Sequence, residues 1–233
     1  MSQTLTYTLE DGVALLAMDD GKANALSETM IASLESHLSR AEKEAKAVLL
    51  LGRADRFSVG FDLRAMMASA DSAKALLRLG ADLLMHMYGL SVPLVIGCTG
   101  HALAGGALML LTGDARIGAS GAFRIGLNEV AIGLPVPILG LTLAEDRLSP
   151  KALTRATLLA QIYGPDDAKT VGYLDEVVAP GDVLERSKAE AKALVGLSQA
   201  AFHGTKLRLR QRSIDRVRAT LEADLGSIGA VGT

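Results

Sequence analysis

The fold is decided by residues 94–106, which read LVIGCTGHALAGG. The stretch opens with the apolar run 94–96, which is typical of a strand that is covered on both faces. A glycine-rich turn follows, and the apolar residues from Gly105 to Thr112 predict a buried helix. Strand, turn and helix in this order predict one unit of an α/β fold with a parallel sheet.

The same order of elements occurs upstream. Apolar residues at steps of three and four after Ser27 predict a helix, and the apolar run 47–51 predicts the strand that follows it. A second helix is predicted over residues 71–88, shortly before the strand at 94–96. Helices and strands that alternate in this way predict a sheet whose strands are joined by crossover helices.

The chain begins with a predicted hairpin. The runs 4–8 and 13–18 are rich in β-forming residues, and they are joined around Asp11-Gly12, a dipeptide typical of tight hairpin turns. The first residues have neither the basic nor the apolar region of a signal peptide, so we expect no export.

The C-terminal part of the chain is predicted to be helical. Charged and apolar residues are mixed over 181–196 and again over 199–225, as in helices with one exposed face. We predict a single domain that spans the chain (1–233), with an α/β core over about residues 1–180 and a helical region over about 181–233.

Composition argues against several classes of partner. The net charge is -2 and the charged residues, 21% of the chain, are spread over both halves, so we expect no nucleic-acid partner. The single cysteine, Cys98, lies in an apolar run, where we expect a buried thiol; without a second cysteine no disulfide can form within the chain, which fits a reducing cytoplasm. Residues 83–113 carry no Asp, Glu, Lys or Arg, but Pro93 and several glycines interrupt them, so we predict buried strand and helix rather than a membrane span.

Two loops carry the small residues that a ligand site requires. Residues 56–62 (RFSVGFD) and 100–106 (GHALAGG) each follow a predicted buried strand. Ligands bind beyond the C-terminal ends of parallel strands, so we expect the two loops to face the same crevice. Glycine in such loops lets a ligand approach the backbone, although tight turns and close helix packing also require glycine.

Other catalytic and binding motifs are absent or incomplete. The sequence has no G-x-x-x-x-G-K-[ST] phosphate loop, and no G-x-G-x-x-G follows the first strand. Residues 118–121 (GASG) approach the nucleophile elbow of serine hydrolases, but the second glycine comes one residue early. His86 and His101 lack acidic or histidine neighbours at ligand spacing, so we predict no metal site and interpret His101 as a hydrogen-bonding loop residue.

One acid is a candidate for proton transfer. Glu129 lies in residues 126–135 (GLNEVAIGLP), and apolar surroundings would raise the pKa of its carboxyl group toward neutrality. An isolated glutamate is also common as a solvated residue or as a helix cap, so the residues alone leave both interpretations open.

Several segments, in order, resemble the crotonase superfamily, also called the enoyl-CoA hydratase/isomerase family, from about Thr4 to about Lys206. They are residues 23–26 (ANAL), 57–63 (FSVGFDL), 100–106 followed by Asp114 and the Gly-Leu-Asn-Glu segment, and 172–178 (GYLDEVV). The resemblance implies a spiral of ββα units with a helical C-terminal region that is used in trimer formation, often as a dimer of trimers.

The resemblance also implies a site for an acyl-coenzyme A thioester. The N–H groups of Phe61 and Gly105 would hold the thioester oxygen, where charge develops during the reaction. Coenzyme A would be part of the substrate, so we expect no separate cofactor. The residues expected to line the substrate path are Lys22, Ala23, Ala25, Ser58, Gly60, Asp62, Leu63, Leu108, Leu134 and Lys206. Either of the two lysines could meet the phosphates.

Leu108 favours one reaction of the family over another. Family hydratases carry two glutamates that activate water; the first position is occupied here by Leu108 and the second by Glu129. One carboxylate is sufficient to move a proton from C2 to C4, so we predict an enoyl-CoA isomerase acting in fatty-acid β-oxidation. The alternatives are an enoyl-CoA hydratase and a non-catalytic acyl-CoA-binding protein.

Overall fold

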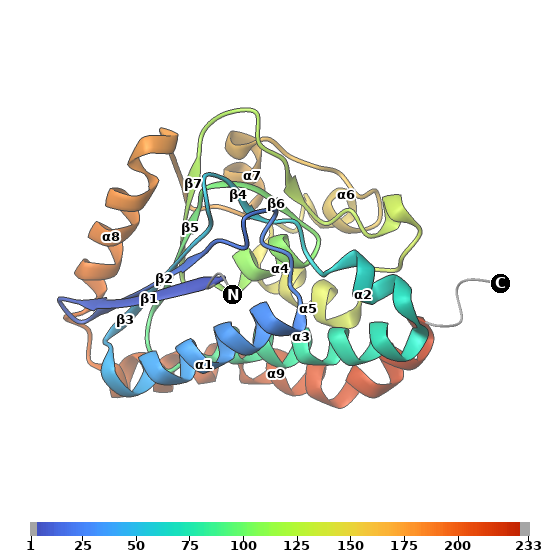
Figure 1. Ribbon diagram of the computed structural model, residues 1–233, viewed down its shortest axis with the longest axis horizontal. Helices are drawn as coiled ribbons and strands as arrows, with labels where there is room; N and C mark the ends of the chain where they lie inside the picture. Colours follow the sequence, from blue (N-terminus) through green and yellow to red (C-terminus); the bar gives the residue numbers. More distant parts are fainter. Residues whose placement is uncertain (1–3, 229–233) are drawn as a thin grey trace.

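The computed structural model describes residues 4–228, in which helices surround two sheets (Figure 1). Within this range the larger sheet has six strands in the order β1-β2-β3-β5-β7-β9. They are β1 (Leu5–Glu10), β2 (Val13–Met18), β3 (Ala47–Leu51), β5 (Leu94–Cys98), β7 (Ala115–Ala119) and β9 (Glu176–Val178). β1 and β2 are antiparallel and every later pair is parallel, which confirms the predicted α/β class.

A second, smaller sheet was not expected from the sequence. Its strands β4 (Asp55–Ser58), β6 (Gly100–Leu103) and β8 (Ile125–Gly126) are parallel and lie in that order. The first halves of the two predicted loops are therefore strands. β4, β6 and β8 follow β3, β5 and β7 along the chain, which gives the repeated β-β order expected for a spiral of ββα units.

Close packing between the starts of β4 and β6 explains why residue 100 is a glycine. A Cβ atom on Gly100 would lie 2.1 Å from the carbonyl carbon of Asp55, so no side chain fits where β6 meets β4.

Helices connect and cover the two sheets. They are α1 (Glu28–Glu44), α2 (Leu63–Ala68), α3 (Ala70–Gly89), α4 (Gly105–Thr112), α5 (Ile138–Arg147), α6 (Leu153–Thr157), α7 (Pro165–Val171), α8 (Val183–Leu194) and α9 (Gln199–Ile228), with 3-10 turns at Val130–Ile132 and Pro180–Asp182. α8 packs against β3, β5 and β7 on one side of the large sheet, whereas α9 packs against α3 and α5 on the other (Figure 1). The predicted C-terminal helices are confirmed, but residues 176–178 add strand β9 to the sheet edge before them.

Local sequence explains the first elements. The hairpin turn uses Asp11 and Gly12, both with positive φ (52° and 80°), which matches the right-handed twist of the two strands. Ser27 caps α1 by accepting a hydrogen bond from the Met30 amide at 3.2 Å. Burial of the apolar face of α1, which includes Leu34 and Leu38, stabilises the fold by roughly 2 kcal/mol per leucine.

The apolar centre of the chain forms the core, as predicted. All five residues of β3 and of β5 are buried, and Cys98 is 1% exposed. Among the described helices, none is long and apolar enough to cross a membrane. The limits of the predicted domain, residues 1–3 and 229–233, lie outside the described part of the chain.

Candidate active site

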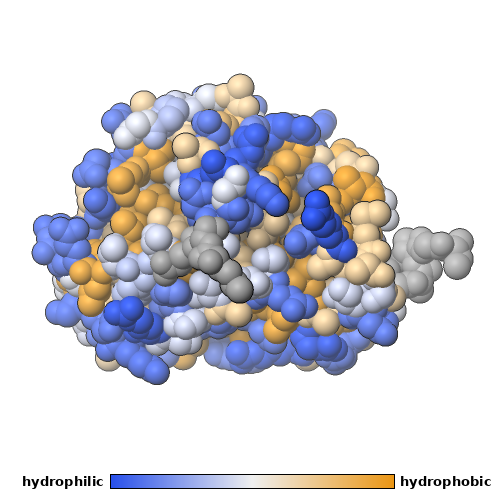
Figure 2. Space-filling view, viewed as in Figure 1, coloured by the Kyte–Doolittle hydropathy of each residue, from blue (hydrophilic) through white to orange (hydrophobic). Residues whose placement is uncertain are grey.

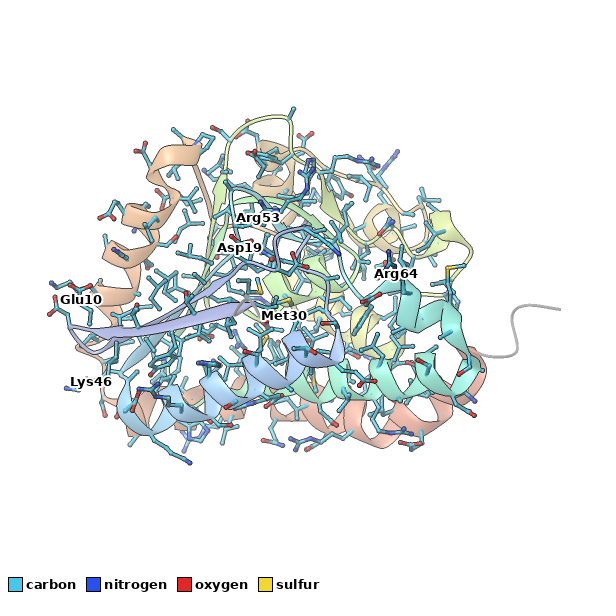
Figure 3. All side chains as sticks on the ribbon, in the orientation of Figure 1. Glu10, Asp19, Met30, Lys46, Arg53 and Arg64 are labelled. Carbon is cyan, nitrogen blue, oxygen red and sulfur yellow. The ribbon has the colours of Figure 1, made fainter. Side chains whose placement is uncertain are left out.

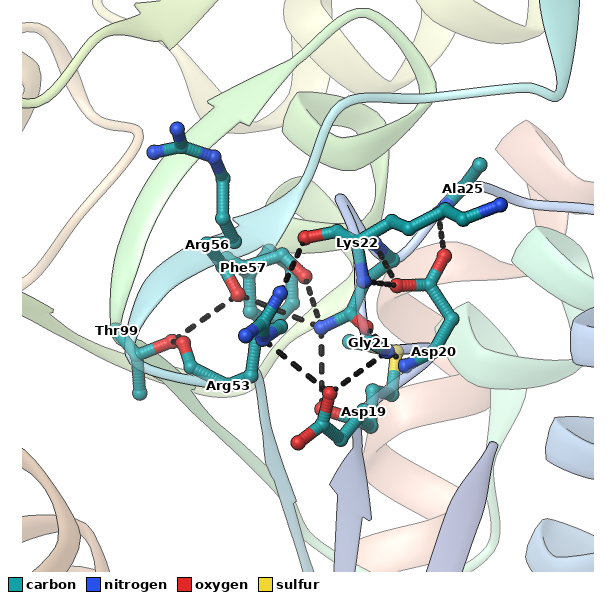
Figure 4. A network of polar contacts seen from close by, with 11 residues as sticks. Asp19, Asp20, Gly21, Lys22, Ala25, Arg53, Arg56, Phe57 and Thr99 are labelled. Atoms are coloured by element: carbon teal, nitrogen blue, oxygen red, sulfur yellow. Dashed lines mark hydrogen bonds and ion pairs between the residues drawn. The ribbon is translucent and has the colours of Figure 1, made fainter. Parts of the chain in front are cut away.

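A carboxylate organises the first loop of the site, which follows β2. The Asp20 carboxylate accepts hydrogen bonds from the amides of Lys22 (2.7 Å), Asn24 (2.9 Å) and Ala25 (3.2 Å) (Figure 4). Asn24 itself has a φ of 50°, a conformation that asparagine tolerates better than most residues. Hydrogen bonds among its own residues therefore help to hold the conformation of this loop.

The first loop is bound to the loop that follows β4. The Asn24 side chain donates to the carbonyl groups of Met18 and Phe57, both at 3.1 Å, and the Ser58 hydroxyl donates to the Asn24 carbonyl at 2.7 Å. The Leu26 amide donates to the Gly60 carbonyl at 2.8 Å. These bonds bring the backbone of residues 23–26 against that of residues 57–60. Of the candidates for the substrate path, Ala23 and Ala25 are partly exposed here, whereas Ser58 and Gly60 are buried.

Arg53, in the turn between β3 and β4, also binds the first loop. Its Nη1 donates to the Lys22 carbonyl at 2.7 Å, and its Nε lies 3.2 Å from the Asp19 carboxylate. Figures 3 and 4 show the Asp19 and Arg53 side chains meeting just beyond the ends of β2 and β3. The sequence contained no pattern that marked this arginine.

The third loop, before α4, contacts the second at its glycines. A Cβ atom on Gly106 would lie 2.2 Å from the Ser58 carbonyl oxygen, so the two backbones touch. The Phe61 ring packs over Gly80 of α3, where a Cβ atom would lie 2.2 Å from the ring. This packing fixes the Phe61 backbone beside Gly105, whose own Cβ position lies 3.2 Å from the same ring.

Two backbone donors are free at this contact. Within residues 4–228, neither the Phe61 amide nor the Gly105 amide donates a hydrogen bond to another protein group. Ala104 has φ 48° and ψ -123°, a conformation that costs a non-glycine residue about 1–3 kcal/mol and fixes the orientation of the Ala104–Gly105 peptide. Two unpaired amides on adjacent loops can bind the oxygen of a developing oxyanion.

The small sheet places the segment that contains Glu129 beside the loop that contains Ala104 and Gly105. The Ala104 amide donates to the Gly126 carbonyl at 3.1 Å, and Glu129 follows three residues later, at the start of a 3-10 turn. The residue is 7% exposed, and its Oε2 has no hydrogen-bond partner among the described residues. Burial raises the pKa of the carboxyl group, and the Glu129 amide only partly opposes this shift.

The apolar candidates fall into two groups. Leu108 is 1% exposed in α4, close to Gly140 of α5, so it belongs to the core behind the loops. Leu63 and Leu134 are 65% and 37% exposed. Figure 2 shows apolar surface at the end of the molecule where α2 lies, and Met67 adds to it with 83% exposure.

The charged candidates Asp62, Lys22 and Lys206 lie in three different surroundings. The Asp62 carboxylate caps α2 by accepting from the Arg64 amide at 2.8 Å. Lys22 is exposed at the first loop, whereas Lys206 is 5% exposed, with its Nζ 2.8 Å from Asp114 Oδ2. Asp114 precedes β7 and also accepts from the Leu94 amide, at the end of the sheet opposite the loops. The structure therefore does not bring Lys206 to the site, and burial lowers its pKa to about 8.

His101 lies on β6, at the start of the third loop segment. His101 accepts a hydrogen bond from the Arg124 amide at 3.0 Å through Nδ1, which confirms its predicted role in the loop. Among residues 4–228 no group of three or more His, Cys, Asp and Glu side chains could hold a metal ion.

Comparisons with known proteins identify the family of the chain. A family model described as enoyl-CoA hydratase/isomerase matches residues 8–231. The structure of an enoyl-CoA hydratase/isomerase family protein from Pseudomonas syringae has a TM-score of 0.94 and 37% identity, covering 97% of this chain and 98% of that one. The human mitochondrial enoyl-CoA delta isomerase 1 is 27% identical over 92% of this chain and 72% of its own length. A probable enoyl-CoA hydratase from Rhodobacter capsulatus is 29% identical, over 87% of this chain and 79% of its own length. The chain therefore belongs to the enoyl-CoA hydratase/isomerase family, which is part of the crotonase superfamily.

Proposed function

We propose that this enzyme is an enoyl-CoA isomerase, which moves a double bond between C3 and C2 of an acyl-CoA thioester in fatty-acid β-oxidation. The observation that carries the proposal is the state of Glu129. Its carboxyl group is buried, the Oε2 atom has no hydrogen-bond partner among the described residues, burial raises the pKa, and the residue at the position of a second acid, Leu108, is apolar. A single base without a second acid to activate water suits proton transfer within the substrate.

The proposed reaction needs two groups from the protein. The Glu129 carboxylate removes a proton from C2 of a 3-enoyl-CoA, and the electrons move toward the thioester oxygen. The free amides of Phe61 and Gly105 bind that oxygen and stabilise the dienolate. Glu129, now protonated, returns the proton at C4, so that the double bond lies between C2 and C3. No water is consumed.

The loops around these groups are proposed to bind coenzyme A. Ala23, Ala25, Ser58 and Gly60 lie on backbone segments that are already fixed by hydrogen bonds, so little conformational freedom would be lost on binding. Leu63 and Leu134 offer exposed apolar surface for an acyl chain, and Lys22 is free to meet a phosphate.

A hydratase is the second candidate, because a relative of similar identity carries that name. Hydration would require Glu129 to activate water alone or with an acid such as Asp62, whose carboxylate here caps α2. Hydration ranks second because Leu108 occupies the position of the second acid and because Asp62 already caps a helix.

The two activities can be separated in one experiment. The purified protein is assayed on a 3-enoyl-CoA and on a 2-enoyl-CoA, with Glu129→Gln as the test variant and Glu185→Gln, an exposed acid on α8, as the matched control. We expect isomerisation that falls by about 10³-fold in Glu129→Gln alone, with retained binding of a saturated acyl-CoA. Efficient hydration by the wild type, or full isomerisation by Glu129→Gln, would overturn the proposal.

The oligomeric state can be proposed from the exposed apolar side chains. We propose a homotrimer or a dimer of trimers, since Leu158, Leu159 and Leu209 are 65%, 62% and 74% exposed and would be covered in an assembly. Light scattering on the purified protein should give three or six times the chain mass of 24.3 kDa. A cytoplasmic location remains a prediction from the single, buried cysteine.

A further inference from the structure

The Phe61 side chain lies between two glycines that belong to different helices. A Cβ atom on Gly80, in the interior of α3, would lie 2.2 Å from Cε1 and 2.5 Å from Cζ of the ring. A Cβ atom on Gly105, at the start of α4, would lie 3.2 Å from Cδ2 and Cε2, on the opposite edge of the same ring. The ring therefore spans the space between α3 and the start of α4, and no Cβ atom fits beside it at Gly80.

The backbone of α3 gives no reason for a glycine at residue 80. Gly80 is buried, its φ is not positive, and glycine is less favourable than alanine inside a helix. The three described atoms that lie nearest to its Cβ position all belong to the Phe61 ring. Contact with this ring therefore explains why residue 80 has no side chain.

The backbone of Phe61 is held by a different neighbour, Leu26. The two residues form a parallel bridge, and the Asp62 amide donates to the Leu26 carbonyl at 3.2 Å. The Leu26 side chain also lies against the start of α4, since a Cβ atom on Gly105 would lie 3.1 Å from its Cδ1. Between these contacts, the Phe61 amide donates to no group within residues 4–228. Leu26 and the packed ring together therefore set where this free amide lies relative to Gly105.

We propose that Gly80 is a positioning residue for the oxyanion donors: because residue 80 has no Cβ atom, the Phe61 ring packs against α3, and the packed ring places the Phe61 amide beside the Gly105 amide. The inference rests on the proposed function, in which these two amides bind the thioester oxygen. Such donors stabilise a developing charge only when both lie within hydrogen-bond distance of it. A side chain at residue 80 would push the ring toward Gly105, where the contacts are already close, and would displace the donors.

Addition of a methyl group tests this role. In Gly80→Ala we expect kcat for the 3-enoyl-CoA to fall by about 10²-fold, because a donor displaced by about 1 Å loses most of its effect. KM should stay within about threefold, because the donors act mainly in the transition state. Gly204→Ala is the matched control. It adds the same methyl group to the interior of α9, where no described atom lies within 4 Å of the Cβ position, and it should change neither constant.

Phe61→Leu distinguishes positioning from a purely structural role. Leucine keeps the backbone amide of residue 61 but lacks Cε1 and Cζ, the atoms nearest to Gly80. Phe61→Leu alone creates no clash and should lower kcat by about tenfold, because the shorter side chain no longer spans the two helices. Addition of Gly80→Ala in this background should lower kcat by less than about threefold further. An equal effect of Gly80→Ala in both backgrounds, or unchanged kcat in Phe61→Leu, would overturn the inference.

The donor positions can also be measured without turnover. Crystal structures of the wild type and of Gly80→Ala give the distance between the amide nitrogens of Phe61 and Gly105. We expect this distance to change by about 1 Å in Gly80→Ala and not in Gly204→Ala. An equal distance in the wild type and in Gly80→Ala would overturn the inference. A wild type without isomerase activity would instead contradict the proposed function, while the measured distances still show whether Gly80 positions the two amides.

Discussion

A Cβ atom on Gly60 would lie 2.9 Å from the amide nitrogen of Gly105. The two loops are therefore in backbone contact at the point where the free amides lie. Gly60 also has a φ of +93°, which disfavours any side chain. The position of the Gly105 amide therefore depends on residue 60 having no Cβ atom.

Gly60→Ala should displace the Gly105 amide and reduce kcat/KM for isomerisation by about 10²-fold, because oxyanion donors act only when they are correctly placed. Gly12→Ala is the matched control. It has a similar φ of +80°, but its Cβ atom would meet Val195 at an ordinary 3.5 Å. Steady-state kinetics measure kcat/KM of both variants. Equal kcat/KM in Gly60→Ala and Gly12→Ala would contradict a role of the Gly60 contact in placing the Gly105 amide.

Ala104→Gly should increase the free energy of unfolding by about 1 kcal/mol, because glycine adopts the φ of 48° without strain. The same exchange at Ala32, an exposed position of α1, should decrease the free energy of unfolding by about 1 kcal/mol. Denaturant unfolding measures both. Destabilisation of similar size in the two variants would show that the Ala104 backbone is not strained.

Arg53→Ala should weaken substrate binding without altering the chemical step. The variant loses the bond to the Lys22 carbonyl, so the first loop is less well fixed and KM should rise about fivefold, with kcat within about twofold. Arg40→Ala removes an exposed ion pair with Glu44 on α1 and should change neither constant. A fall in kcat with constant KM would assign Arg53 a different role.

Glu129→Gln should be more stable than the wild type at pH 8. Burial raises the pKa of Glu129 above its unfolded value, so the folded protein binds the proton more tightly and loses stability as pH rises through the folded pKa. The neutral amide has no such cost. The gain in the free energy of unfolding should disappear toward pH 4.5, where the carboxyl group is protonated in the folded protein. A gain that is constant with pH would have another origin.

His86 should stabilise the fold in a defined range of pH. Its hydrogen bonds to Glu35 (2.6 Å) and Glu42 (3.0 Å) raise its pKa to about 9, and its bond to Glu42 holds the pKa of that acid at about 2. The contribution of His86 is complete below its unfolded pKa of about 6.5 and is lost as pH rises through 9.

His86→Gln should therefore lower the free energy of unfolding by about 2 kcal/mol at pH 6 and by much less above pH 9. Glu42 contributes above about pH 4.5 and loses its contribution as pH falls through about 2, so the difference should persist to acid pH. Unfolding curves at several pH values provide the measurement. A difference that grows with pH would contradict the ion pairs.

The sequence alone determined the α/β class, the hairpin and the predicted helices, because these depend on periodicity and turn residues that act locally. The Asp11-Gly12 turn and the apolar run of β5 both appeared where their patterns predict them. The resemblance placed Phe61, Gly105 and Glu129 as candidates, and their segments follow β4, β6 and β8, which are neighbours in the small sheet. The sequence therefore predicted which segments form the candidate site and their order along the chain.

Only the tertiary structure decided how these segments meet. The small sheet depends on pairing between strands of two to four residues, which are too short for a pattern to mark. Lys206 was predicted to lie on the substrate path, but long-range packing of α9 buries it against Asp114. The strain at Ala104 and the hydrogen bond from Arg53 to the Lys22 carbonyl arise from contacts between residues far apart in the chain, and no local preference encodes them.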